Sequence, residues 1–153
     1  MYQSLVKTVR FTMDTQKTIG RVAARLFTVS PEAYLSSEYF LQFCRGDDLE
    51  DTWKESLERS RDRPDLYGDA VIKNAFVLFL LHIVHNRPDE FPALLGRFLT
   101  GLSREIYQPL PLDDLKMDLV DLGYPAQDLE KKFSVLRAEE KDRRERGTTR
   151  CPG

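Results

Sequence analysis

The chain has 153 residues, of which 41% are hydrophobic and 31% charged, with a formal net charge of −2. A chain of this length fits one domain and can bury a hydrophobic core. Its near-neutral charge excludes a global electrostatic signature of nucleic-acid or membrane binding. The first residues lack the apolar run of a secretory signal, and the two cysteines, Cys44 and Cys151, form no disulfide framework. We therefore expect a cytoplasmic protein.

The pattern in the first part of the chain is mostly helical. Residues 2–13 carry an apolar stripe at helical spacing, but several of these apolar residues also alternate as in a strand. The pattern therefore fits both a helix and a strand, and a helix is favoured. Ser30, followed by a proline, predicts an N-cap for a helix over 31–45 that ends at Gly46. Asp47 is then expected to cap a further helix, which fades near residues 61–65.

Residues 70–85 contain the most apolar stretch of the chain. The run from 70 to 84 is interrupted by Lys73, Asn74 and His82, and a membrane span needs about 20 mostly apolar residues. No membrane partner is therefore expected. Because the stretch is apolar on nearly every side, we predict the central helix of a bundle, with Asp69 as its cap. Its core residues are expected to be Phe76, Phe79, Leu80 and Ile83.

The C-terminal half predicts three more helices. Residues 91–106 form a strong amphipathic pattern, and a short helix follows that ends at Gly123 and Pro125. A last helix begins near Ala126, and its apolar positions end at Leu136. We predict an all-α, single-domain bundle of about six to seven helices over residues 1–137. The charged segment 138–153 is expected to be a mobile tail.

Two histidines and a carboxylate are the candidates for a metal site. His82, His85 and Asp89 would share one face if the helix continued through all three, and imidazole with carboxylate suits zinc or iron. Pro88 is expected to end the helix first, however. The favoured interpretation places His82 in the core and His85 at the helix C-terminus. No metal or other cofactor is then required, and a metal-dependent enzyme is only an alternative.

An acidic stretch, residues 47–58, contains a thin apolar line formed by Leu49, Trp53 and Leu57. Aromatic anchors surrounded by charge are common in protein interfaces. Because the other faces of this helix are charged, we expect the edge of Trp53 to remain near solvent, available to a partner protein or to a second copy of the chain. A peripheral helix whose stripe covers the core is the other interpretation.

Residues 115–137 predict two helices joined by a glycine-containing turn, the arrangement of a helix-turn-helix or of any αα corner. Internal packing is expected from Leu119, Leu122, Leu129 and Phe133. Phosphate or base contacts would come from Gln127, Lys131, Lys132 and Arg137.

The sequence contains no nucleophile elbow and no phosphate-binding glycine loop. The leading hypothesis is therefore a non-enzymatic helical protein that binds another macromolecule, foremost a protein, or that forms a homodimer. A nucleic-acid-binding regulator that uses residues 115–137 is the first alternative.

Overall fold

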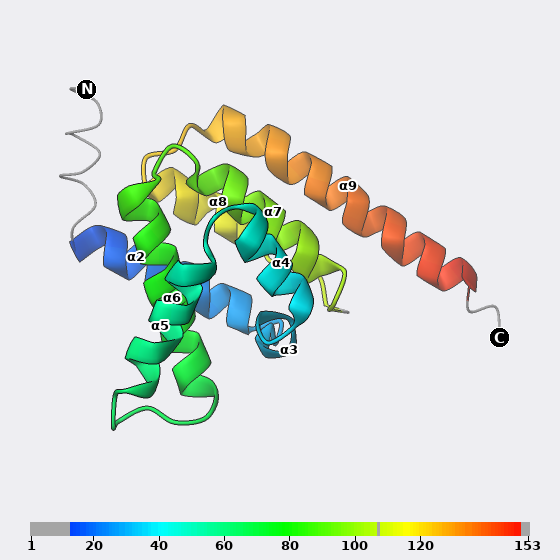
Figure 1. The fold of residues 1–153 in the computed structure, drawn as a ribbon. Coiled ribbons are helices and arrows are strands. Elements are labelled where there is room, and N and C mark those ends of the chain that lie inside the picture. Colours follow the sequence, from blue (N-terminus) through cyan, green and yellow to red (C-terminus); the bar gives the residue numbers. More distant parts are fainter. Residues whose placement is uncertain (1–12, 107, 151–153) are drawn as a thin grey trace.

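The computed structural model describes residues 13–106 and 108–150, with all side chains in these ranges except those of residues 13, 143, 144 and 146–150. Residues 2–12, for which the sequence left helix and strand open, lie outside the described residues. The described part folds into eight α-helices without a strand, which confirms the all-α bundle (Figure 1). These helices are α2 (Met13–Phe27), α3 (Glu32–Leu35), α4 (Glu38–Gly46), α5 (Glu50–Arg61), α6 (Asp69–Asn86), α7 (Phe91–Ser103), α8 (Leu112–Asp121) and α9 (Ala126–Arg150).

Helix α6 is the central helix predicted from the apolar run. It packs against α2, α3 and α5, and its phenylalanine rings meet rings from α4 and α7. The four predicted core residues, Phe76, Phe79, Leu80 and Ile83, are all buried. The helix ends at Asn86, two residues before Pro88, as predicted. Burial of these side chains removes most of its apolar surface from water and fixes the centre of the fold.

The helix predicted over 31–45 is two helices, because a serine inside it caps a new one. The Ser37 hydroxyl accepts a hydrogen bond from the Phe40 amide (3.3 Å) and donates one to the Tyr34 carbonyl (2.6 Å). This N-cap starts α4 in a new direction. Ser30 does not act as the predicted cap, because its backbone is left-handed, with φ 54°.

The predicted caps of α5 and α6 are also wrong by a few residues. Helix α5 begins at Glu50, and Asp47 instead accepts two hydrogen bonds from the Arg97 guanidinium, at 2.8 and 3.1 Å. Its carbonyl accepts a third from Arg87 (2.6 Å). Asp69 is the first residue of α6, and Gly68, at φ 63°, occupies the cap position. The ion pair with Arg97 engages the Asp47 carboxylate that the sequence assigned to capping.

Helix α9 is longer than its apolar residues require. Its inward positions Leu129, Phe133 and Leu136 are buried, and the helix continues to Arg150, beyond the predicted end of the domain at residue 137. Figure 1 shows it lying along α7 and α8 and then extending past them. Glu140 accepts a hydrogen bond from the Leu110 amide (3.0 Å), which holds this part of α9 to the α7–α8 connection. Mobility of the segment after residue 137 stays a prediction.

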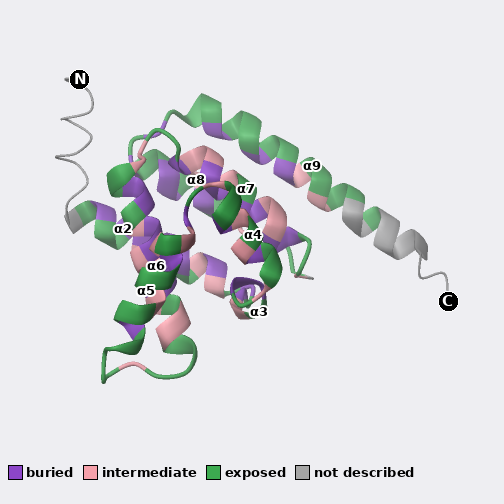
Figure 2. Cartoon of the chain, in the orientation of Figure 1, coloured by how far each residue is buried: buried purple, intermediate pink, exposed green. Residues whose placement is uncertain are grey.

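Burial follows the inward side of each helix. Figure 2 shows buried residues on the sides of the helices that face one another and an exposed outer face along α9. Among the described helices, none combines the length and the apolar character that crossing a bilayer requires.

A buried carboxylate joins α2 to α8. The Asp118 side chain, only 3% exposed, accepts a hydrogen bond from Arg25 Nε at 2.7 Å and lies 3.4 Å from Arg21 Nε. The hydrogen bond to Asp118 is the main cause that raises the pKa of Arg25. Removing this carboxylate would take from Arg25 its one buried charged partner and leave it only the exposed Asp114. Asp118 is therefore a structural residue that fixes α8 against α2.

We expect Asp118→Asn to lower the free energy of unfolding by about 1.5–3 kcal/mol, the range for hydrogen bonds to charged groups. Asp121→Asn is the matched control, because Asp121 pairs with Arg21 at 3.3 Å but is exposed; its loss should stay below about 1 kcal/mol. Urea denaturation of both variants measures the difference. Equal losses would show that burial of Asp118 contributes nothing.

Phe40→Ala should cost about 3–5 kcal/mol, because a fully buried ring would leave a cavity among other aromatic side chains. Its neighbour Tyr39 is exposed, so Tyr39→Ala should change stability by less than about 0.5 kcal/mol. Thermal and chemical unfolding of the pair measures both effects. A loss below about 1 kcal/mol for Phe40→Ala would contradict the core described above.

Candidate functional site

A tight corner between α8 and α9 begins the candidate site. Gly123 has φ 105°, a left-handed conformation that favours glycine. Its amide donates to the Val120 carbonyl (2.9 Å), and the Tyr124 amide donates to the Leu119 carbonyl (3.1 Å). These bonds close the C-terminus of α8 and turn the chain sharply into α9. The predicted αα corner over 115–137 is therefore present.

Tyr124 fastens this corner to the connection between α6 and α7. Its hydroxyl donates to the Pro88 carbonyl at 2.6 Å, and its ring lies against Phe91, with 6.1 Å between ring centres. Burial raises the pKa of Tyr124 well above its usual value, so the hydroxyl stays protonated and remains a donor. The relative position of α7 and α9 is fixed at this point.

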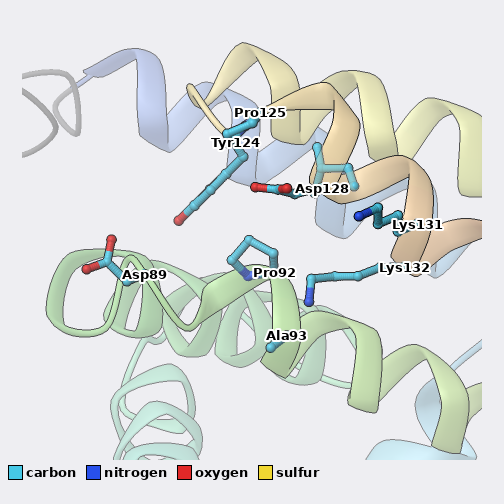
Figure 3. Close-up of a pocket in the computed structure, with 9 residues that line it drawn as sticks. Asp89, Pro92, Ala93, Tyr124, Pro125, Asp128, Lys131 and Lys132 are labelled. Atoms are coloured by element: carbon cyan, nitrogen blue, oxygen red, sulfur yellow. The ribbon is translucent and has the colours of Figure 1, made fainter.

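An open groove of about 470 Å³ lies between the start of α7 and the start of α9 (Figure 3). We call it the α7–α9 groove. Its apolar surface and its charged rim come from the same short segments, and Lys132 extends from α9 toward α7. The lining residues are Asp89, Pro92, Ala93, Tyr124, Pro125, Asp128, Leu129, Lys131 and Lys132.

The groove combines apolar and charged side chains. Within the described part of the chain, neither Lys131, Lys132 nor Asp128 belongs to an ion pair, so their charges are available to a partner. The lining contains two lysines and two aspartates, so its charges are balanced. None of the lining residues is a serine, cysteine or histidine, the side chains that most often provide a nucleophile and its base.

The four residues predicted to contact nucleic acid do not all line one site. Lys131 and Lys132 line the groove, whereas Gln127 is exposed outside it. Arg137 forms ion pairs with Asp113 and, at 3.7 Å, with Glu130. The predicted packing residues of the corner, Leu119, Leu122, Leu129 and Phe133, are all buried.

The expectation that Trp53 keeps an edge near solvent is wrong. Trp53 is 3% exposed and Leu49 1%, and Leu57 is half-buried. The indole packs edge-on against Phe40 (5.0 Å between ring centres) and Phe79 (5.5 Å). The charged residues of α5 do cover its outer faces, but one narrow stripe is enough to bury an aromatic side chain when the helix lies along α6. Burial of Leu49 and Trp53 removes the argument for a docking surface centred on the indole.

His82 does not lie in the core, and this expectation is wrong too. Although α6 is the central helix, its neighbours do not cover the face that carries His82 and His85. Both histidines and Asp89 are exposed. Over residues 13–106 and 108–150, no group of three or more His, Cys, Asp and Glu side chains is placed to hold a metal ion. The structure therefore does not assemble the alternative metal site.

Sequence reasoning missed most of the groove. The sequence marked Pro125 as a helix boundary and assigned no site role to Pro92, Ala93 or Tyr124. One signal was available in the prolines. Pro92 lies in the first turn of α7 and Pro125 directly precedes α9, and both positions mark the start of a helix. Only tertiary structure brings residues 89–93 beside residues 124–132.

Comparisons of the chain with protein-family models, with curated proteins and with solved structures found no match.

Proposed function

We propose that the protein is a non-enzymatic helical interaction protein that binds a partner protein through the α7–α9 groove. One observation carries the proposal: an apolar surface is bordered by Asp128, Lys131 and Lys132, none of which forms an ion pair with another described residue. Interfaces combine an apolar centre with a polar rim in this way. The helices that form the groove are fixed by the Tyr124 hydrogen bond, so a partner would meet a preformed surface.

The occupant that fits this chemistry is an extended segment of another protein. An apolar side chain of the partner would lie against Pro92 and Ala93, and an acidic one would face Lys131 and Lys132. Asp128 on the same rim favours a polypeptide that carries both signs of charge over a uniformly anionic ligand.

Nucleic acid is the weaker candidate for the same helix. Neutralisation of phosphates requires a local excess of available cations. Here Asp128 and Glu130 lie beside the two lysines in the sequence, and Arg137 is held by Asp113. The α8–α9 corner is better explained as the wall of a protein-binding groove.

A cytoplasmic location is part of the proposal. Cys44 is buried and carries a free thiol, and burial raises its pKa to about 12, so the thiol is protonated and inert. A small apolar filler of this kind suits a reducing compartment. A homodimer would be one form of the proposed interaction, but the surface predicted for it, Leu49 with Trp53, lies in the core.

Site-specific photo-crosslinking in cells tests the proposal. A benzophenone amino acid in place of Asp128, on the groove rim, should capture a defined partner protein. The same residue in place of Glu139, exposed on α9 outside the groove, is the control.

Lys132→Glu should then weaken binding of the captured partner by about tenfold or more, because attraction at the rim becomes repulsion. Lys141→Glu, on the exposed part of α9, should leave affinity unchanged. Isothermal titration with the purified partner measures both variants. Equal capture at both crosslinking positions would overturn the proposal. Salt-sensitive binding to DNA or RNA that Lys132→Glu abolishes would favour the nucleic-acid alternative.

A further inference from the structure

A second cleft, of about 580 Å³, lies between α4 and α7 on a part of the molecule that the α7–α9 groove does not use. Its volume is in the range of small-molecule sites. Tyr34 and Gly101 lie at its base, Tyr39 and Phe43 provide aromatic surface, and Arg104 and Glu105 bring opposite charges. We call it the α4–α7 cleft.

The Tyr34 hydroxyl is the unusual feature of this cleft. Tyr34 is 3% exposed, and its hydroxyl forms no hydrogen bond with any described residue. Among the described residues that are buried or half-buried, however, every fully buried side-chain nitrogen or oxygen atom has a hydrogen-bond partner. The small exposed part of Tyr34 must therefore include its hydroxyl, and the cleft is where it opens. A deeply placed donor is thus available to a ligand.

The direction of this donor is fixed by aromatic packing. The Tyr34 ring meets Phe40 and Phe98 edge-on, with 5.7 and 5.6 Å between ring centres. Both partners are buried, so the ring cannot swing outward without disturbing the core. The hydroxyl is therefore held at one position before any ligand arrives.

Gly101 leaves the space that the hydroxyl occupies. A Cβ atom at position 101 would overlap Tyr34 Oη and lie 3.0 Å from its Cζ. Gly101 lies within α7, although glycine is a weaker helix former than alanine. The glycine and the tyrosine hydroxyl are therefore coupled, and together they shape the base of the cleft.

One charged side chain of the cleft, Arg104, can bind an anion. Burial is the main cause that raises the pKa of Tyr34 to about 12, so the group remains a hydrogen-bond donor at neutral pH. Arg104 belongs to no ion pair among the described residues, whereas Arg97 is committed to Asp47 through two hydrogen bonds. A carboxylate could accept from the Tyr34 hydroxyl and the Arg104 guanidinium together. Glu105 on the same wall repels negative charge, and so it favours a ligand with one carboxylate over a ligand with two.

We propose that the α4–α7 cleft binds a monocarboxylate with an aromatic or apolar body, its carboxylate between Tyr34 and Arg104 and its body against Tyr39 and Phe43. Both a free organic acid and the C-terminal residue of a peptide offer this chemistry. The proposal is independent of the α7–α9 groove and extends the function proposed above.

Titration of the ¹⁵N-labelled protein with phenylacetate tests the site. Amide resonances of Thr100, Gly101 and Arg104 should shift in a saturable way, and phenylacetamide, which has the same body without the charge, should bind at least tenfold more weakly. N-acetyl-Ala-Ala-Phe and its C-terminal amide repeat the comparison for a peptide. Preference for the free acid or for the peptide identifies the source, and either preference supports the site.

Tyr34→Phe should weaken phenylacetate binding by about fivefold to tenfold, the value of one hydrogen bond. Arg104→Gln should cause a similar loss without risk to folding, because Arg104 is exposed. Arg59→Gln, an exposed arginine of α5 outside the cleft, is the matched control and should bind as the unchanged protein does. The proposal is overturned if these amides do not shift, if phenylacetamide binds equally well, or if Arg104→Gln has no effect.

Discussion

The packing around Phe40 is the constraint on which the rest of the structure depends. This fully buried ring of α4 contacts Tyr34 of α3, Trp53 of α5, Phe79 of α6 and Phe98 of α7. All four of these contacts are edge-on, which is a favourable arrangement for aromatic quadrupoles. Because interiors are close-packed, displacement of one ring would require its neighbours to move as well. The Ser37 cap sets the start of α4 and so directs Phe40 into this cluster.

The peripheral helices depend on polar contacts in addition to this core. Asp47 ties the α4–α5 connection to α7 through Arg97, Asp118 ties α8 to α2, and Tyr124 ties the last corner to the residues before α7. Helix α7 lines both clefts: its first turn lines the α7–α9 groove and its last turns line the α4–α7 cleft. Ala93 and Gly101 are eight positions apart, about 12 Å along a helix, so the two clefts can accept different ligands.

The sequence predicted the interior of the fold better than its surface sites. Periodic apolar residues and the glycine and proline boundaries were sufficient for α6, α7 and α8, because burial of a continuous stripe dominates those helices. The break before α4 was missed because Ser30 and Ser37 offer equally good capping chemistry, and only the backbone conformation distinguishes them. Trp53 was misplaced for a different reason. Sequence shows how many charges surround a residue, but it does not show which single face of the helix points inward.

Local sequence patterns could not predict the candidate sites, because each site is formed by segments that are distant in the sequence. The α7–α9 groove combines residues 89–93 with 124–132, and the α4–α7 cleft combines residues 34–43 with 97–105. The α4–α7 cleft nevertheless contains two residues, Tyr34 and Gly101, that are not the most stabilising choices for folding. Phenylalanine at position 34 would form the same ring contacts and would be sufficient for folding, because it lacks the hydroxyl for which no described residue is a hydrogen-bond partner. Folding would also favour a better helix former than Gly101 once that hydroxyl were gone. Neither residue is explained by the core it belongs to, and departures from local preference of this kind are expected at binding sites. A ligand that accepts from Tyr34 accounts for both.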